Sequence, residues 1–269
     1  MDIQVNKKKL ESVWHGPAPE VAPTLIFLHE GLGSVSMWKD FPQKLSRYTG
    51  CGALVYSRLG YGNSEKCDLP RPLNFMNKEG LEVLPEIISS CKIQKYIIVG
   101  HSDGASIALI HAGSETANKL LGIINEAPHV FCEKLTISSI KKLRENFYSG
   151  NLRERLKNYH KDIDLTFNAW AEVWLDNEFT KWNIESYLPQ IKVPQLIIQG
   201  NNDEYGTLAQ VEAISRKSAG VVETCFLENC GHSPHRDQKS KTLQIMSEFV
   251  RNLLIILFII TQSFKFLAF

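Results

Sequence analysis

Residues 95–112 read KYIIVGHSDGASIALIHA, a short apolar run, a serine between two glycines and a second apolar run. The first run is β-branched and predicts a buried strand, and the last run predicts a buried helix. Gly100 and Gly104 leave room where a Cβ would clash, so the turn can be sharp and Ser102 projects from its tip. We interpret this strand–turn–helix as a nucleophile elbow with Ser102 as the nucleophile, in preference to a tight turn without chemistry.

A nucleophilic serine needs a base, and the base needs an orienting carboxylate. Residues 194–200 predict a strand that ends in glycine, and Asp203 and Glu204 follow it. Residues 223–227 predict the next strand, and His232 lies in the loop after it. These carboxyl ends of strands are where open α/β sheets gather their ligands. We therefore predict His232 as the base and Asp203 as its acid, with Glu204 as the alternative acid.

Five motifs together resemble the α/β-hydrolase superfamily, and more closely its bacterial esterase-like, lactonase-like and biphenyl-hydrolase-like members. The resemblance covers roughly residues 3–253. It implies the α/β-hydrolase fold, with a mostly parallel central sheet, helices on both faces and a helical cap insertion. It also implies hydrolysis through an acyl-enzyme without a cofactor. In chain order the motifs are Leu28–Gly33, Ser57–Ser64, Gly100–Gly104, Gly200–Asp203 and Gly231–His232.

The resemblance implies an oxyanion hole made of two backbone amides. One belongs to Asp103, the residue after the nucleophile, and the other to Gly31. Glu30 stands where related sequences carry glycine, and we expect its side chain to face solvent. We expect His29 to shape the same loop. The Asp103 carboxylate either pairs within the elbow, which we favour, or attracts a cationic substrate group.

The remaining chain divides by its periodicity. Residues 1–128 and 190–254 alternate strands and helices and predict one discontinuous hydrolase core. Residues 129–189 are helical and aromatic, without a convincing strand, and they match the place of the cap. Within them, Trp170 and Trp174 share a helical face. We predict that these two tryptophans contact substrate, while most of the other aromatic side chains form the core of the cap.

Several elements are predicted individually. Residues 3–5 and 10–14 form a hairpin around the lysines 7–9, and a first helix covers 37–48. A helix over 78–91 carries Pro85, which interrupts or kinks it. The last helix spans 237–254. After it, the predicted tail 255–269 is apolar but too short to span a membrane, which takes about 20 residues.

Composition narrows the classes of function. The 269 residues are 43% apolar with a net charge of +1, which predicts a substantial core and no nucleic-acid footprint. The six cysteines form no CxxC and no disulfide pattern, and the N-terminus is no signal peptide, so we expect a reduced cytoplasmic protein. We expect no stable membrane insertion. The alternatives for the apolar tail are a peripheral membrane anchor, a contact in a homodimer and an extension without a role, and we favour the last two.

Metal chemistry is not expected. Cys230, His232 and His235 are close in sequence, but no second ligand cluster accompanies them, so we predict no metal site. We expect His235 to cap or flank the last helix at the surface. His101 is expected to pack beside the serine, and His111 to lie in the core or an interface.

The sequence therefore predicts a serine hydrolase that cleaves a small carboxylic ester, thioester or lactone. A serine at the elbow argues against dehalogenase and epoxide hydrolase chemistry, which uses a carboxylate there. The alternatives are a hydrolase of C–C bonds from aromatic degradation, an acyltransferase, and a ligand-binding receptor with slow turnover. The expected partner is a small acyl substrate.

Overall fold

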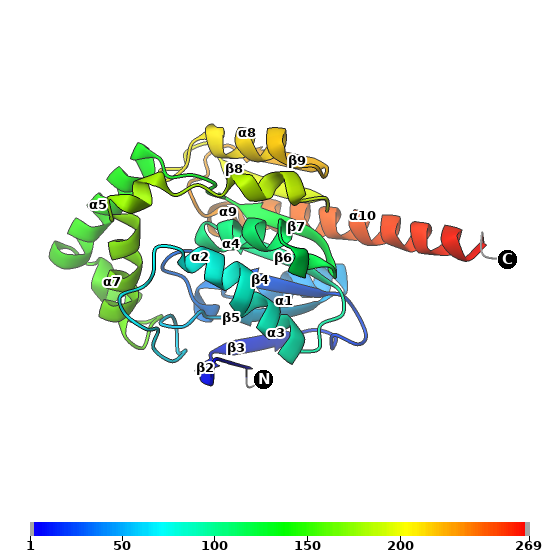
Figure 1. The fold of residues 1–269 in the computed structure, drawn as a ribbon, viewed down its shortest axis with the longest axis horizontal. Coiled ribbons are helices and arrows are strands. Elements are labelled where there is room, and N and C mark those ends of the chain that lie inside the picture. Colours follow the sequence, from blue (N-terminus) through cyan, green and yellow to red (C-terminus); the bar gives the residue numbers. More distant parts are fainter. Residues whose placement is uncertain (1–2, 267–269) are drawn as a thin grey trace.

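A mostly parallel sheet forms the centre of the molecule (Figure 1). The computed structural model describes residues 3–266, with side chains through residue 259. Within that range the main sheet has seven strands, and only β3 runs antiparallel, against β5 at one edge. The spatial order is β3 (Ser12–His15), β5 (Gly52–Tyr56), β4 (Thr24–Leu28), β6 (Tyr96–His101), β7 (Leu120–Glu126), β8 (Gln195–Gly200) and β9 (Val222–Leu227).

Helices cover both faces of this sheet, because successive side chains of a strand point to opposite sides. On β4, Leu25 and Phe27 enter one core, and Ile26 and Leu28 enter the other. The predicted α/β-hydrolase fold class is confirmed. The first core is covered by α1 (Phe41–Thr49) and α10 (Lys239–Phe266), and the second by α3 (Leu84–Ser90), α4 (Asp103–Ala112) and α8 (Leu208–Lys217).

A helical segment connects β7 to β8. Between residues 129 and 189, all of them described, the only β-structure is one isolated bridge between Phe131 and Asn183. Figure 1 shows α5 and α7 together at one end of the molecule, opposite the end from which α10 projects. The segment contains α5 (Lys134–Ser149), α6 (Leu152–Leu156), α7 (Ile163–Trp174), η4 (Glu178–Lys181) and η5 (Glu185–Gln190).

The N-terminal hairpin differs from its prediction. Strands β1 (Ile3–Val5) and β2 (Lys8–Leu10) pair antiparallel, so the turn lies one position earlier than expected. Asn6 and Lys7 have φ of 50° and 65°, the positive values that a two-residue hairpin turn requires. The following β3 joins the main sheet instead of the hairpin.

The predicted helix over 78–91 begins earlier and is interrupted. It consists of α2 (Phe75–Lys78), a π-helical turn η2 (Glu79–Val83) and α3. The wide turn ends two residues before Pro85, which lacks the N–H that a regular helix would use. The predicted interruption is therefore confirmed. The first helix is also split, into η1 (Val35–Trp38) and α1, and a short η3 (Glu115–Ala117) precedes β7.

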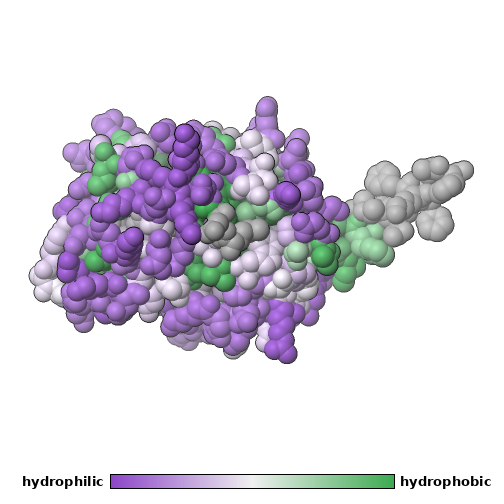
Figure 2. All heavy atoms as spheres, turned by 90° about the horizontal axis from the view of Figure 1, so that it is seen from below, coloured by the Kyte–Doolittle hydropathy of each residue, from purple (hydrophilic) through white to green (hydrophobic). Residues whose placement is uncertain are grey.

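The C-terminal helix is longer than predicted. A short α9 (Pro234–Asp237) precedes α10, which continues past residue 254 to Phe266, so the predicted end was wrong. Residues 267–269 of the predicted tail lie outside the described residues. Figure 2 shows the apolar surface of α10 where the helix leaves the body. The exposed apolar side chains are Ile255, Ile256, Phe258 and Ile259.

Helix α10 is long and apolar enough to cross a membrane by length and composition alone. That is weak evidence, because its first half is a core helix. Phe249, Val250 and Leu253 are buried in the apolar core on one face of the sheet. The apolar composition of this half is therefore accounted for by packing.

The packing of α4 on β4 generates a test. A Cβ at Gly104 would lie 2.0 Å from the backbone oxygen of Leu28, so Gly104→Ala must push helix and strand apart. We expect it to lower the free energy of unfolding by about 3 kcal/mol in urea titrations. Gly50→Ala is the comparison, since its Cβ meets open space and only its φ of 73° is strained, which costs about 1 kcal/mol. Equal losses would contradict this packing.

Candidate active site

The strand–turn–helix predicted around Ser102 is formed by β6 and α4. Ser102 has φ of 54° and ψ of −116°, a strained conformation for a residue with a side chain. The flanking glycines are required by space: a Cβ at Gly100 would lie 2.6 Å from the Cα of Ala105. The turn thus places Ser102 at the N-terminus of α4, whose first backbone N–H groups have no partner within the helix.

Ser102, His232 and Asp203 form one hydrogen-bonded chain. His232 Nε2 lies 2.9 Å from Ser102 Oγ, and His232 Nδ1 lies 2.8 Å from both carboxylate oxygens of Asp203. An ionised carboxylate only accepts, so Nδ1 carries the proton and Nε2 accepts from the serine hydroxyl. Ser102 directly follows β6, and Asp203 and His232 lie in the loops after β8 and β9, so the three residues are far apart in sequence.

The Asp203 carboxylate is held ionised. Burial by itself would raise its pKa, but the hydrogen bond from His232 and the backbone N–H groups of Tyr205 and Gly206 outweigh it and lower the pKa of Asp203 to about 2. Gln199 Nε2 also donates to this carboxylate at 2.7 Å. Within the described side chains, Asp203 is the carboxylate bonded to His232, whereas the alternative acid Glu204 is exposed.

The loop after β4 carries Gly31 beside the serine. A Cβ at Gly31 would lie 2.1 Å from Trp170 Nε1, so glycine is required there by contact with the helical segment. The Arg58 guanidinium donates to the backbone oxygens of His29, at 2.6 Å, and Glu30, at 3.0 Å. His160 Nε2 donates to the oxygen of Leu32 at 2.8 Å. The loop is therefore held both by Arg58, which follows β5, and by His160 of the helical segment.

His29 shapes this loop as a neutral ring, in agreement with its predicted role. Its Nδ1–H donates to the Glu30 oxygen at 2.7 Å, and its Nε2 accepts from the Arg58 backbone N–H at 3.1 Å. Burial, and next the Arg58 charge, hold the pKa of His29 well below its ordinary value. The neutral tautomer satisfies both nitrogens.

Three rings surround His232: His101 at 5.3 Å, His129 at 5.5 Å and Tyr205 at 4.7 Å between centroids. Burial lowers the pKa of His129 to about 3, so this neighbour adds no positive charge beside the candidate base. Sequence reasoning missed His129 and Tyr205. Tyr205 comes two residues after Asp203, and His129 comes three residues after the end of β7, so their positions at strand ends were the available signal.

The two predicted substrate-contacting tryptophans occupy different places. Trp170 lines a cavity of about 200 Å³ that also contains Ser102 and His232. Trp174 does not line it, and this part of the prediction is not supported. Instead Trp174 is buried, and its Nε1–H donates to Asp103 Oδ1 at 3.1 Å. Leu143, Leu152 and Leu156 of the helical segment complete much of the apolar wall.

The Asp103 carboxylate is buried, and Asp103 is not among the residues that line this cavity. It accepts from Trp174, and burial raises its pKa against the opposing charge of Arg58. The favoured expectation of an internal hydrogen bond agrees with this placement. The backbone N–H of Asp103 occupies the first position of α4, where a helix leaves its amides free.

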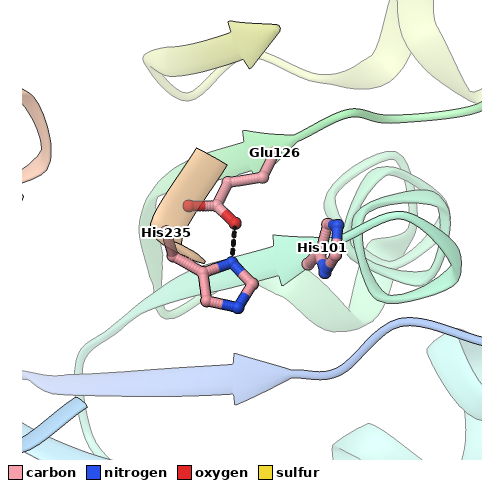
Figure 3. A group of neighbouring side chains, drawn as sticks. All are labelled: His101, Glu126 and His235. Atoms are coloured by element: carbon pink, nitrogen blue, oxygen red, sulfur yellow. Dashed lines mark hydrogen bonds and ion pairs between the residues drawn. The ribbon is translucent and has the colours of Figure 1, made fainter. Parts of the chain in front are cut away.

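A buried cluster of ionisable groups includes His101, the residue before Ser102 (Figure 3). His101, Glu126 and His235 bring donor atoms within 4.8 Å of one another, and His235 Nδ1–H donates to Glu126 Oε2 at 2.5 Å. The expectation of a surface position for His235 was wrong, because its ring packs 4.5 Å from the ring of Trp38. Glu126 ends β7 and was not singled out from the sequence.

Comparisons with known proteins agree with the fold. The family model described as "Alpha/beta hydrolase family" matches residues 25–243, so the chain belongs to this family. A proline iminopeptidase from Saccharolobus solfataricus is 24% identical, over 84% of each chain. A 2-succinyl-6-hydroxy-2,4-cyclohexadiene-1-carboxylate synthase from Salmonella paratyphi A is 22% identical, over 88% of this chain and 97% of the relative.

The solved structure of an enol-lactonase from Burkholderia xenovorans LB400 superposes with a TM-score of 0.73. It is 19% identical, and the match covers 93% of this chain and 99% of that one. At this identity the likeness concerns the fold. The named relatives carry out different reactions, so family membership establishes a hydrolase of the α/β class and leaves the substrate to be inferred from the site.

The role of Asp203 can be tested by Asp203→Asn. An amide can donate to His232 Nδ1, which favours the tautomer that cannot accept from Ser102. We expect the rate of Ser102 modification by a fluorophosphonate to fall by about four orders of magnitude. Glu204→Gln is the matched variant and should retain most of the reactivity. A larger loss in Glu204→Gln than in Asp203→Asn would reassign the acid.

Proposed function

We propose that this protein is a serine hydrolase that cleaves a small carboxylic ester, thioester or lactone through an acyl-enzyme. The observation that carries the proposal is the chain Ser102–His232–Asp203, with bonds of 2.9 Å and 2.8 Å, opening on a cavity. Its order of donors and acceptors is what nucleophilic catalysis by serine requires.

In the first half-reaction, His232 Nε2 takes the hydroxyl proton of Ser102 as Oγ attacks the substrate carbonyl. The carbonyl π electrons move onto its oxygen, and the amides of Asp103 and Gly31 stabilise that negative charge. When the carbonyl reforms, the bond to the leaving group breaks. His232 gives its proton to the departing alkoxide or thiolate, and the acyl group stays on Ser102.

In the second half-reaction, His232 takes a proton from water, which attacks the acyl carbonyl. Collapse of this second intermediate breaks the bond to Ser102 Oγ, and the proton returns to the serine. The acid is released with both side chains restored. Asp203, ionised throughout because its pKa is lowered to about 2, stabilises the imidazolium formed in each half.

The size of the cavity supports a small substrate. Its volume of about 200 Å³ lies below the range of roughly 300–1,000 Å³ common for sites that hold drug-sized ligands. Leucines and Trp170 line much of it, which favours an apolar acyl group. The likeness to an enol-lactonase makes a lactone one of the substrates to try.

The helical segment 129–189 acts in this proposal as a cap. It supplies Trp170 and three leucines to the wall around Ser102. Apolar side chains there exclude bulk water, which strengthens the electrostatic interactions of the site. Chain-length selectivity would then depend on this segment and not on the sheet.

Replacement of Ser102 tests the proposal directly. Ser102→Ala should abolish multiple turnover of p-nitrophenyl esters and labelling by a fluorophosphonate, while the circular dichroism spectrum stays that of the wild type. The ester panel should increase in acyl length and include an enol-lactone. Retained labelling of Ser102→Ala would remove Ser102 as the nucleophile.

Other outcomes would favour the remaining alternatives. Labelling of Ser102 without turnover of any ester would favour a C–C bond hydrolase, to be tried with a ring-cleavage product. Release of p-nitrophenol that stops after one equivalent per protein molecule would favour a receptor. Acyl transfer to an added alcohol that outcompetes water would favour an acyltransferase.

The two tryptophans should behave differently. Trp170→Ala enlarges the cavity, so we expect kcat/KM for a hexanoate ester relative to an acetate ester to rise about tenfold. Trp174→Phe removes the bond to Asp103 outside the cavity and should leave this ratio unchanged while lowering the melting temperature. Equal shifts of the ratio in both variants would contradict the assigned positions.

A further inference from the structure

Glu30 is not the solvent-facing residue that the sequence suggested. Its side chain is 19% exposed, and Glu30 Oε2 lies 3.6 Å from His101 Nδ1. Glu30 precedes Gly31, the proposed oxyanion donor, and His101 precedes Ser102. The contact therefore joins the loop after β4 to the elbow between β6 and α4.

His101 makes a second contact, to the loop that carries His232. His101 Nε2–H donates to the backbone oxygen of His232 at 2.7 Å. With Nε2 donating, Nδ1 faces a carboxylate favourably only when it also carries a proton. Burial by itself lowers the pKa of His101, but the Glu30 carboxylate, together with Glu126 and the His232 backbone oxygen, outweighs burial and raises the pKa above its ordinary value. Burial likewise raises the pKa of Glu30, and His101 more than reverses this.

We propose that the ion pair between the partly exposed Glu30 and the buried His101 is a positioning device that fixes the backbone of His232 relative to the oxyanion loop, the loop after β4 that carries Gly31. The inference rests on the proposed function. Neither side chain takes part in a chemical step. They hold the Ser102 hydroxyl, the His232 ring and the oxyanion amides in one arrangement. Small displacements from that arrangement would lower the rate of reaction.

A second buried pair, next to His101, holds the segment that carries His232. His235 follows His232 by three residues, and its bond to Glu126 attaches α9 to the end of β7. Figure 3 shows the His235 and Glu126 side chains pointing toward each other, with His101 beside them on the neighbouring strand. The loop with the candidate base is thus tied to both β6 and β7.

The charge on His101 depends on all the titratable groups around it. Its neighbours come from the loop after β4, from β7 and the residues that follow it, from the loop after β9, and from α9. These groups are Glu30, Glu126, His129, His232 and His235. The two carboxylates favour a protonated ring, and Glu30 contributes most.

A divalent cation is the competing occupant, because two imidazoles and a carboxylate are common zinc ligands. We favour the hydrogen-bonded arrangement because His101 Nε2 is taken by the oxygen of His232 and His235 Nδ1 by Glu126. The hydrogen bond from His101 Nε2 to the backbone oxygen of His232 also has a role in the proposed function, because it positions the candidate base. The zinc content of the purified protein is therefore one readout of the test.

The experiment compares Glu30→Gln, Glu30→Asp and His101→Gln on the best ester of the panel. Glu30→Gln removes the charge and should lower kcat about 100-fold with little change in KM. Glu30→Asp keeps the charge and should recover part of the loss. His101→Gln should lower kcat similarly, and the double variant Glu30→Gln/His101→Gln should be no worse than either single one.

The pH profile separates positioning from a merely structural role. Because the pKa of His101 is raised, its ring stays protonated and the pair stays charged at low pH. The pair loses its charge as the pH rises through that pKa. The alkaline limb of kcat should therefore move to lower pH in Glu30→Gln. It should be absent in His101→Gln, which has no titrating ring. Glu223→Gln, on the exposed side of β9, is the matched control for charge.

A buried histidine elsewhere controls for stability. His111, whose Nε2 lies 2.7 Å from the Tyr96 hydroxyl, is at the far end of α4. His111→Gln should lower the melting temperature without moving the alkaline limb. An unchanged kcat and unchanged limb in folded Glu30→Gln and His101→Gln would overturn the proposal.

Stoichiometric zinc in the wild type that is lost in His101→Gln and His235→Gln would also overturn it, in favour of a metal site. Failure of the proposed function looks different. The wild type itself would then turn over no ester of the panel, with or without labelling of Ser102. Fluorophosphonate labelling rates, which need no known substrate, should follow kcat in all the variants.

Discussion

The sharp turn at Ser102 is the constraint on which the other parts of the site depend. It exists because Gly104 lies against the backbone of Leu28 and Gly100 lies against Ala105, so β4, β6 and α4 meet without side chains between them. The positive φ of Ser102 is maintained by this packing. One turn therefore sets the positions of the serine oxygen, the amide of Asp103 and the ring of His101.

Buried ionisable groups are costly unless each finds a partner. Here Glu30 meets His101, and Glu126 meets His235, at the carboxyl ends of neighbouring strands. The first pair connects the segments that carry Gly31 and Ser102, and the second attaches the segment that carries His232 to the end of β7. These connections explain why ionisable side chains occupy buried positions at which apolar side chains would cost less free energy.

Most elements were predictable because their signals are local. The apolar strands, the glycine-flanked serine and the order of Asp203 and His232 indicated the fold and the triad geometry found here. The boundaries failed where local rules compete: the hairpin turn moved to Asn6 and Lys7, and the last helix continued through the apolar tail. Trp170 and Trp174 share a helical stripe, yet only one reaches the cavity, because the other meets the buried Asp103.

The sequence by itself determined the class of fold and the three residues of the hydrogen-bonded chain, since strand ends of a parallel sheet meet at one edge. The tertiary structure alone decided the surroundings of that chain. Glu30, His101, Glu126 and His235 are spread over two hundred residues of sequence and carry no shared motif. Their contacts exist only because β4, β6 and β7 are neighbours in the sheet and the segment after β9 reaches past β8 to the ends of β6 and β7. Long-range pairing of this kind leaves no periodicity in a single sequence.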